Sequence, residues 1–429
     1  MSNYTVQPAA GVRGAISVPG DKSISHRSIM FGSLAKGTTI VRGFLRGEDT
    51  ISTLKAFRAM GVNACDDGEV IRIQGAGLHG LKEPVDVLDC GNSGTSMRLL
   101  TGMLAGQDFF SVLSGDQYLR NRPMGRVIEP LAGMGATIFG RAGGTRAPLA
   151  IQGRTLKGIS FSSPVASAQV KSALLLAGLY ADGETRVTEP SLSRDHSERM
   201  LRYFGADIEP LSNGARIRGG RILEGREVHV PGDISSAAFF IVAALLVPDS
   251  ELLITGVGMN PTRTGIIDIL LRMGASIEQL NFSETSGEPV ADLLVRSSSL
   301  HGIEIGGELV PRAIDEFPII CVAAACAEGK TVLRDARELR VKETDRIAAM
   351  AANLSKAGVS VVETEDGMEI TGGDRLLGCT ADSFGDHRIA MSMIMAGLVA
   401  KGETTVTDVG CISTSFPSFI ELLERVCVR

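Results

Sequence analysis

The chain has 429 residues, of which 44% are apolar and 21% charged, and its formal net charge is −6. This composition is ordinary for a globular protein and excludes disorder as the main state. No Lys/Arg-rich run is present, which argues against nucleic acid as a partner. The longest apolar run, Ala237 to Val247, is far shorter than the roughly 20 residues that a membrane-spanning helix needs.

The N-terminal residues MSNYTVQPAA contain no basic segment followed by an apolar stretch, so we expect no signal peptide. The seven cysteines form no CxxC pair, which favours free thiols in a reducing compartment over metal ligands or disulfides. We therefore expect a cytoplasmic protein without a metal site.

Six segments along the chain repeat one pattern. Each has a polar opening, an apolar helix of about a dozen residues and, in most, a short Thr/Val-rich strand. Their starts are roughly 70 residues apart, a regularity typical of internal repeats. The segments are DKSISHRSIMFGSLAKG from Asp21, GNSGTSMRLLTGMLAG from Gly91, SAQVKSALLLAGLYADG from Ser167, SSAAFFIVAALLVPDS from Ser235, IDEFPIICVAAACAEG from Ile314 and GDHRIAMSMIMAGLVAKG from Gly385.

A second helix is expected in five of the repeats, and each ends at a glycine that turns into a strand. The glycines are Gly61, Gly135, Gly205, Gly274 and Gly358. Glycine adopts the left-handed conformation that ends many helices. The first helix of each repeat is apolar nearly all round and is expected to be buried, whereas the second is amphipathic.

The tetrapeptide Val-Pro-Gly-Asp occurs twice, at 18–21 and at 230–233. Because Pro-Gly pairs mark turns, we interpret the two copies as crossings between two domains of three repeats each. The expected domains are a continuous one, 20–233, and a discontinuous one, 1–19 plus 234–429. Two adjacent crossings also predict a hinge.

Polar and basic residues gather at the expected helix starts. A helix N-terminus carries partial positive charge and free N–H donors, so several starts directed at one cleft would bind anions. Ser, Thr, Asn and Asp there are also ordinary caps. Lys and Arg oppose the helix dipole, however, and their repetition at Lys22, Arg27, Arg98, Lys171 and Arg388 indicates a bound anion.

Further basic residues lie in loops. Arg122 precedes Pro123 and Gly125 in a Gly/Pro-rich loop, Arg194 falls in SLSRDHSE, and Lys342 and Arg346 fall in ELRVKETDRI. For the last segment, an exposed helix face with Lys342 and Arg346 four residues apart remains an alternative.

Together these motifs closely resemble the 5-enolpyruvylshikimate-3-phosphate synthase family, end to end. The matching motifs are VPGDKSISHR, GNSGTSMR, RNRPM, ASAQVKSA, SRDH, IDE, KETDR and FGDHR. The resemblance implies an α/β protein with two domains, each an inside-out α/β barrel of three βαβαββ repeats with buried parallel helices.

The resemblance also implies the reaction. Members of the family transfer the enolpyruvyl group of phosphoenolpyruvate to the 5-hydroxyl of shikimate 3-phosphate and release phosphate, a step toward chorismate and the aromatic amino acids. They use no cofactor. The expected partners are these two small molecules, with no membrane or nucleic acid, and a monomer is expected.

The family's site residues carry over to matching positions here. The implied shikimate 3-phosphate ligands are Lys22, Ser23, Arg27, Ser167, Ala168, Gln169, Arg194, Asp315 and Lys342. The implied phosphoenolpyruvate ligands are Lys22, Gly94, Thr95, Arg122, Gln169, Arg346 and Arg388. At Gly94, any side chain would intrude on the phosphate.

The implied catalytic residues are Asp315, Glu343 and Lys22. Asp315 would take the proton from the 5-hydroxyl, and either Glu343 or Lys22 would protonate the methylene carbon, with the family's mechanism favouring Glu343. One group must act first as acid and then as base. A carboxylate among many cations is stabilised in its ionised form, so the sequence leaves the assignment open, as it does the role of His387.

One segment departs from part of the family. Some members carry a Lys before the Phe-Pro near the C-terminus, whereas here Ile412 to Pro417 contains none. This resembles a second bacterial branch that includes glyphosate-insensitive members, some with Ala where this chain keeps Gly94. Because Gly94 is kept, we expect glyphosate to compete with phosphoenolpyruvate.

Three alternative functions agree less well with the sequence. A UDP-N-acetylglucosamine enolpyruvyl transferase typically has a Cys ahead of the Arg that is Arg122 here, and residues 116–121 contain none. A non-enzymatic anion-binding protein would not need Asp315 and Glu343. An RNA-end-modifying relative is disfavoured by the net charge.

Overall fold

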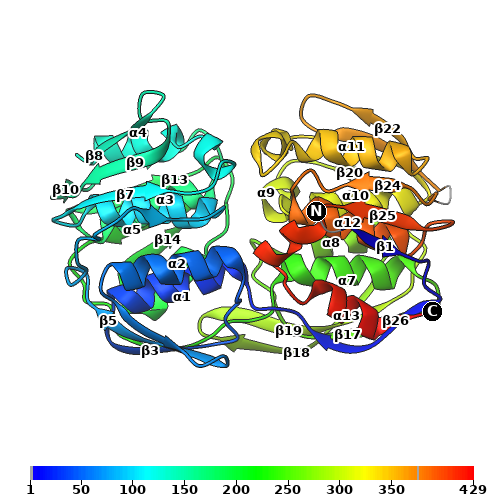
Figure 1. Cartoon of the computed structure of the whole chain (residues 1–429), viewed down its shortest axis with the longest axis horizontal. Helices are drawn as coiled ribbons and strands as arrows, with labels where there is room; N and C mark the ends of the chain where they lie inside the picture. The colour runs from blue at the N-terminus through cyan, green and yellow to red at the C-terminus, as the bar shows by residue number, and fades with distance from the viewer. Residues whose placement is uncertain (1–2, 374–375) are drawn as a thin grey trace. The chain divides into compact units, whose positions relative to one another are not determined.

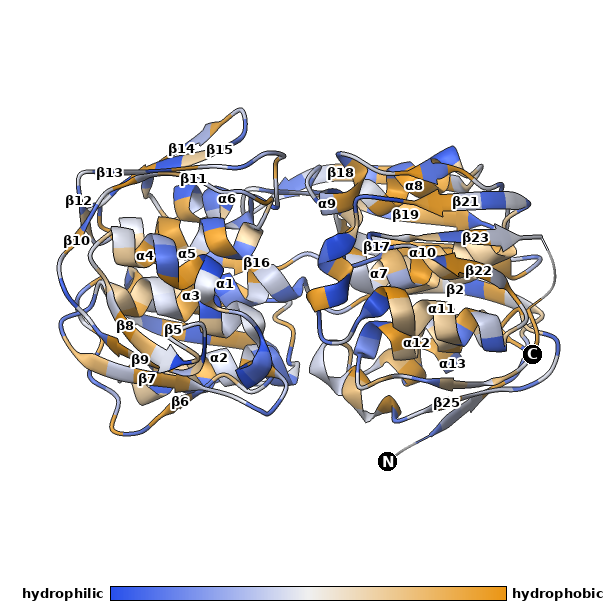
Figure 2. Cartoon of the chain, turned by 90° about the horizontal axis from the view of Figure 1, so that it is seen from above, coloured by the Kyte–Doolittle hydropathy of each residue, from blue (hydrophilic) through white to orange (hydrophobic). Residues whose placement is uncertain are grey.

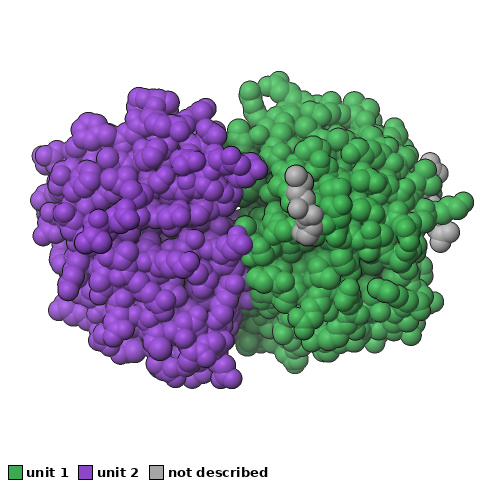
Figure 3. Space-filling model, viewed as in Figure 1, with its two compact units in different colours: residues 1–19, 231–283, 289–429 green, residues 20–230, 284–288 purple. Residues whose placement is uncertain are grey.

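The computed structural model describes residues 3–373 and 376–429. The chain divides into two compact units, coloured separately in Figure 3. Unit 1 consists of Met1–Pro19, Pro231–Ser283 and Pro289–Arg429, and unit 2 consists of Gly20–Val230 and Glu284–Glu288. Both units combine helices and sheets (Figure 1), so the fold is mixed α/β.

Three four-stranded sheets of unit 2 share one pairing pattern, in which a parallel pair is followed by two antiparallel pairs. The first, in spatial order, is β16 (Glu227–His229), β3 (Lys36–Arg42), β5 (Val70–Ala76) and β4 (Asn63–Asp66). The second is β6 (Leu88–Asp89), β7 (Phe110–Ser114), β9 (Arg146–Gln152) and β8 (Thr137–Arg141). The third is β11 (Ser160–Ser162), β13 (Glu184–Thr188), β15 (Gly214–Arg218) and β14 (Asp207–Leu211). A short parallel pair joins β10 (Leu156–Lys157) and β12 (Ala181–Asp182).

The helices of unit 2 are of two kinds. Three are buried over most of their length: α1 (Lys22–Leu34), α3 (Gly94–Ala105) and α5 (Ala168–Gly178). Three more bury one side only: α2 (Glu48–Ala59), α4 (Gly125–Gly133) and α6 (His196–Tyr203). A 3₁₀ turn, η1 (Leu119–Asn121), precedes α4. The buried helices begin with side-chain caps, since Asp21 accepts from the amide of Ile24 at 2.8 Å and Ser93 from that of Ser96 at 3.0 Å.

The described residues of unit 1 form three sheets. The largest, in spatial order, is β18 (Ser276–Thr285), β19 (Glu288–Arg296), β17 (Glu251–Gly258), β2 (Gly11–Ser17) and β26 (Cys427–Val428). The second is β20 (Glu304–Ile305), β21 (Gly329–Leu333), β23 (Met368–Gly372) and β22 (Ser360–Glu363). The third is β1 (Tyr4–Val6), β25 (Thr404–Thr407) and β24 (Thr380–Asp382). The N-terminal strands β1 and β2 thus complete sheets made mostly of residues after 230.

Two buried helices of unit 1, α7 (Ile234–Leu246) and α10 (Phe317–Cys326), are the most apolar of the described helices and are largely orange in Figure 2. The buried helices are α7 (Ile234–Leu246), α10 (Phe317–Cys326) and α12 (His387–Gly397). The others are α8 (Gly265–Arg272), α9 (Leu309–Ala313), α11 (Arg346–Lys356), α13 (Phe419–Val426) and the 3₁₀ turns η2 (Arg337–Val341) and η3 (Val409–Thr414). Each unit has its own hydrophobic core around its buried helices. Residue exposure therefore confirms the expectation that the first helix of each repeat is buried.

The five predicted helix-ending glycines are confirmed by the backbone. Gly61, Gly135, Gly205, Gly274 and Gly358 all have positive φ, between 85° and 98°. This conformation is strained for other residues and ends the preceding helix. The turn into the following strand is therefore encoded locally at all five places.

The two Val-Pro-Gly-Asp segments lie side by side. The amide of Asp233 donates to the carbonyl of Pro19 at 2.9 Å. A Cβ on Gly20 would lie 1.9 Å from the carbonyl oxygen of Gly43 and 3.0 Å from Val230. Glycine is therefore required at position 20 by close backbone approach as well as by the turn.

Within the described ranges, every helix is too short or too polar to cross a lipid bilayer.

Candidate active site

The start of α1 carries the first group of predicted ligands. Lys22 is the first residue of α1, and its ammonium forms an ion pair with Asp49 in the first turn of α2. Arg27 lies one turn further and is buried. Its guanidinium donates to Ser197 Oγ at 2.8 Å, to Ser172 Oγ at 2.9 Å and to the carbonyl of Ser23 at 3.0 Å. Burial lowers the pKa of Arg27 to about 10, against opposing effects of Glu198 and Asp21, so Arg27 stays charged at neutral pH.

The starts of α3 and α5 meet through Gln169. Arg98 Nη1 donates to Gln169 Oε1 at 2.7 Å, and Gln169 Nε2 donates to Thr95 Oγ1 at 3.0 Å. Gly94 lies between two guanidinium groups, because a Cβ there would be 2.7 Å from Arg98 Nη1 and 2.9 Å from Arg122 Nη1. The structure therefore brings the predicted residues Gly94, Thr95, Arg122 and Gln169 together, with Arg98 among them.

Ser167 caps α5, and its Oγ accepts from the amide of Val170 at 3.4 Å. The nearby Lys171 is fully buried and forms ion pairs with Glu189 at 3.0 Å and Glu198 at 2.8 Å. Burial opposes the charge of Lys171, but Glu198 and Glu189 outweigh burial and raise its pKa. The interpretation that a bound anion compensates this cation is therefore wrong for Lys171, since protein carboxylates do so.

In unit 1, three cations surround Asp315. Its Oδ1 lies 3.4 Å from Arg346 Nη1 and 3.5 Å from Lys342 Nζ, and its Oδ2 lies 3.9 Å from Arg388 Nη2. Arg388 Nη1 also donates to the carbonyl of Asp315 at 3.0 Å. Asp315 precedes α10, and Arg388 lies in the first turn of α12. The structure thus gathers four predicted residues from separate segments.

Arg346 joins this group to Glu343. Arg346 is the first residue of α11 and is 2% exposed, and its Nη2 lies 2.6 Å from Glu343 Oε2. Burial by itself lowers the pKa of Arg346, but Asp386, Glu343 and Asp315 outweigh it and raise the pKa overall. Lys342 and Glu343 lie before α11 rather than in it, so the alternative of an exposed helix face with Lys342 and Arg346 is wrong.

The predicted residues thus form two groups, one in each unit. The unit 2 group is Lys22, Ser23, Arg27, Gly94, Thr95, Arg122, Ser167, Ala168, Gln169 and Arg194, and the unit 1 group is Asp315, Lys342, Glu343, Arg346 and Arg388. Most are partly exposed, whereas Arg27, Gly94 and Arg346 are buried.

Sequence reasoning missed the carboxylates that balance these cations. They are Asp49 beside Lys22, Glu189 and Glu198 beside Lys171, and Asp386 beside Arg346. In the sequence, Asp49 and Asp386 look like ordinary helix-start residues. Glu189 follows a strand and belongs to none of the motifs. Across the part of the chain that the structure describes, no three His, Cys, Asp or Glu side chains gather as metal ligands would.

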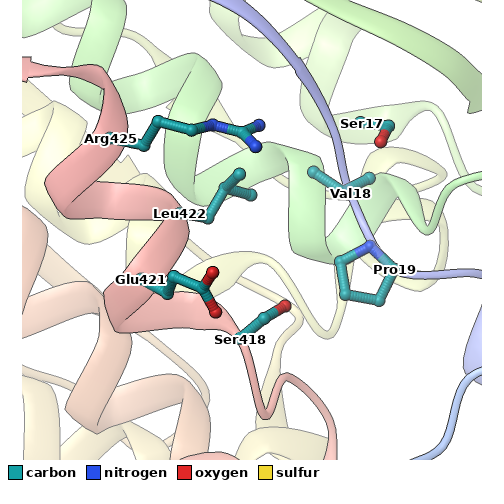
Figure 4. Close-up of a pocket in the computed structure, with 7 residues that line it drawn as sticks. All are labelled: Ser17, Val18, Pro19, Ser418, Glu421, Leu422 and Arg425. Carbon is teal, nitrogen blue, oxygen red and sulfur yellow. The ribbon is translucent and has the colours of Figure 1, made fainter.

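A separate cavity of about 380 Å³ lies in unit 1 (Figure 4). It is lined by Ser17, Val18, Pro19, Ser418, Glu421, Leu422 and Arg425. None of these belongs to the predicted ligand or catalytic set, so the size of this cavity does not bear on the candidate site.

Fold and site together define a mixed α/β protein in which arginine and lysine side chains gather around carboxylates and helix starts, as suits an enzyme for anionic substrates. A family model described as EPSP synthase (3-phosphoshikimate 1-carboxyvinyltransferase) matches residues 6–423. The chain therefore belongs to the EPSP synthase family.

Individual relatives agree with this membership. The chain is 76% identical to the 3-phosphoshikimate 1-carboxyvinyltransferase of Geotalea uraniireducens and 73% identical to that of Geobacter metallireducens, each over 100% of both chains. A solved EPSP synthase from Acinetobacter baumannii matches with a TM-score of 0.90 and 49% identity, covering 99% of this chain and 98% of that one. The enolpyruvyl transferase NikO from Streptomyces tendae, at 19% identity and a TM-score of 0.80 over 98% of this chain and 96% of its own, shares the fold.

Proposed function

We propose that this protein transfers the enolpyruvyl group of phosphoenolpyruvate to the 5-hydroxyl of shikimate 3-phosphate and releases phosphate, a step of the shikimate pathway. The observation that carries the proposal is the unit 1 group, in which Asp315 and Glu343 lie among Lys342, Arg346 and Arg388. A protein that only bound phosphates would gain nothing from carboxylates in that position, whereas acid–base catalysis needs them.

We propose one set of ligands for each of the two substrates. For shikimate 3-phosphate we propose Lys22, Ser23, Arg27, Ser167, Ala168, Gln169, Arg194, Asp315 and Lys342. For phosphoenolpyruvate we propose Lys22, Gly94, Thr95, Arg122, Gln169, Arg346 and Arg388. The contacts of Gln169 with Arg98 and Thr95 support a shared place for the two substrates at the starts of α3 and α5.

The chemistry is an addition followed by an elimination. Asp315 takes the proton of the 5-hydroxyl as its oxygen attacks C2 of the enolpyruvyl group, while Glu343 or Lys22 delivers a proton to C3. In the elimination, a proton leaves the new methyl group and the C2–O bond to phosphate breaks. We favour Glu343 as the group that first donates and then accepts, and its 2.6 Å contact with Arg346, a proposed phosphoenolpyruvate ligand, supports a position beside that substrate.

We further propose that each unit is an inside-out barrel of three βαβαββ repeats. The shared pairing pattern of the three unit 2 sheets supports this architecture. The proposed domains are 20–233 and 1–19 plus 234–429, with a hinge at 18–21 and 230–233. Closure of such a hinge on ligand would exclude water from the reaction. A radius of gyration that stays unchanged with saturating shikimate 3-phosphate in small-angle scattering would count against the hinge.

We also propose a cytoplasmic monomer. The seven cysteines, all in the described part of the chain, are free thiols, as is usual in a reducing compartment. Light scattering of the eluted protein should give the mass of a single chain.

The deciding experiment is a phosphate-release assay with both substrates and with each alone. Release should require both. The variant Glu343→Gln should lose at least about 100-fold in kcat, within the range for a general acid–base group, and still bind shikimate 3-phosphate. Glu363→Gln is the matched control, since Glu363 also pairs with an arginine of unit 1, Arg340, at 2.8 Å. Release from phosphoenolpyruvate alone at the full rate, or a fully active Glu343→Gln, would contradict the proposal.

A further inference from the structure

One buried carboxylate connects two of the unit 2 segments that carry predicted shikimate 3-phosphate ligands. Glu189 follows β13, and its side chain is fully buried. Its Oε1 accepts from the amide of Ser167 at 2.7 Å. It also accepts from Ser193, from the amide at 3.3 Å and from the hydroxyl at 2.8 Å and 2.7 Å. Ser167 caps α5, and Ser193 immediately precedes Arg194.

Lys171 completes this arrangement from within α5. Its ammonium lies 3.0 Å from Glu189 and 2.8 Å from Glu198, and it donates to the carbonyl of Ser193 at 3.2 Å. The loop that leads to Arg194 is therefore held at both the amide and the carbonyl of Ser193. These four side chains, Lys171, Glu189, Ser193 and Glu198, are all at most 5% exposed, so they do not themselves reach a ligand from solvent.

The charges of Lys171, Glu189 and Glu198 also affect the binding of a nearby anion. An unpaired carboxylate beneath a phosphate would repel it, and in the interior that repulsion is strong. The ammonium of Lys171 lies between Glu189 and Glu198, and burial raises the pKa of Glu198. Lys171 therefore reduces the repulsion that Glu189 would otherwise exert while it holds the two segments. A buried ion pair gives little net stability compared with an apolar pair, which makes a role in geometry the better explanation for its presence.

We propose that Glu189 is a positioning residue that fixes Ser167 relative to Arg194 and thereby sets the preference for a phosphorylated over an unphosphorylated shikimate. This inference rests on the proposed function. The proposed ligands of the phosphate group are Ser23, the hydroxyl of Ser167 and the guanidinium of Arg194, and the last two lie on separate segments. Hydrogen bonds to a phosphate weaken steeply when donors are misplaced, so the spacing of the two segments sets its affinity.

The test compares binding of shikimate 3-phosphate and of shikimate by titration calorimetry. Glu189→Gln keeps the shape but offers one acceptor oxygen instead of two, and places an NH₂ group near Lys171 or Ser193. We expect the affinity for shikimate 3-phosphate to fall about tenfold, as for loss of one charge-assisted hydrogen bond. The affinity for shikimate and the KM for phosphoenolpyruvate should stay within about twofold.

The control is Asp66→Asn, which removes the carboxylate of another ion pair of unit 2, with Arg46 at 2.7 Å. It should change neither affinity. If Glu189→Gln does not fold, Ser193→Ala decides the matter, because it removes the hydroxyl contacts and leaves the Glu189–Lys171 pair intact. It should lower the affinity for shikimate 3-phosphate about threefold and leave the affinity for shikimate unchanged.

The outcomes separate this inference from the proposed function. A wild-type protein that does not bind shikimate 3-phosphate overturns the proposed function. If the wild type binds it and Glu189→Gln, or Ser193→Ala in its place, binds equally well, the positioning role is overturned. An equal loss for shikimate and shikimate 3-phosphate also overturns it, since general loosening of the fold does not distinguish the phosphate.

Discussion

The Nε of Arg346 donates to Oδ2 of Asp386 across 2.8 Å, and both side chains are buried. Asp386 also caps α12 by accepting from the amide of Arg388 at 2.8 Å. One carboxylate therefore fixes a proposed phosphoenolpyruvate ligand at the start of α11 and orients the helix that carries another. The remaining carboxylates around Arg346 are Glu343 and Asp315, whose proposed roles are in the chemistry.

Removing the charge of Asp386 should therefore affect both stability and substrate binding. Breaking a buried ion pair by replacing one partner costs about 3 kcal/mol or more, so the midpoint of urea unfolding of Asp386→Asn should fall clearly below that of the wild type. The KM for phosphoenolpyruvate should rise about tenfold as Arg346 shifts. Glu227→Gln, which removes one side of an exposed pair with Arg42, is the control and should leave both unchanged. An unchanged midpoint of urea unfolding in Asp386→Asn would contradict the proposed stabilising role of Asp386.

A methyl group at position 94 should disturb the phosphoenolpyruvate ligands selectively. Its Cβ would lie under 3.0 Å from the guanidinium tips of Arg98 and Arg122, which would have to move. We expect Gly94→Ala to raise the KM for phosphoenolpyruvate about tenfold and to weaken inhibition by glyphosate at least as much, with binding of shikimate 3-phosphate nearly unchanged.

Gly133→Ala is the matched control for this substitution. A Cβ on Gly133, in α4 of the same unit, would meet no atom within 4 Å, and Ala is the better helix former. Its kinetics should equal those of the wild type. The prediction fails if Gly94→Ala keeps wild-type KM and glyphosate inhibition, or if glyphosate never competes with phosphoenolpyruvate in the parent protein.

His26 should make the protein less stable in mild acid. Burial, with Lys22 and Arg27 nearby, lowers the pKa of His26 well below its ordinary 6.5. The unfolded chain then binds more protons than the folded chain below pH 6.5, so stability falls as pH falls through that window. The slope from this one group is at most about 1.4 kcal/mol per pH unit.

Urea unfolding between about pH 7 and about pH 5 measures this slope. His26→Asn keeps a polar side chain near Thr53, which contacts His26 Nδ1 at 2.8 Å, and should reduce the slope. His229→Asn, at a side chain that is 53% exposed, should not. Identical slopes for wild type and His26→Asn would rule out His26 as the source of acid sensitivity.

Much of the local structure followed from the sequence. The apolar runs gave the buried helices, and Gly61, Gly135, Gly205, Gly274 and Gly358 all adopt the predicted left-handed turn. Such features depend on side chains a few residues apart, and a glycine that ends a helix acts through its own φ. The sequence motifs also predicted where these helices begin, because helix starts depend on local residues too. Lys22, Gly94 and Ser167 lie at or next to the first residues of their helices.

The sequence did not indicate which side chains pair with these cations. Lys171 was interpreted as a cation facing a ligand, yet it is fully buried between Glu189 and Glu198. Lys342 and Arg346 fit one helix face by spacing, yet α11 begins only at Arg346.

By itself, then, the sequence determined the helices, their turns and the types of residue at the helix starts, because these are set by local conformational preference and by apolar periodicity. Only the tertiary structure decided which carboxylate balances which cation. Asp49, Glu189 and Asp386 reach their partners across packed helices and loops, and such distances depend on how whole elements pack rather than on spacing along the chain.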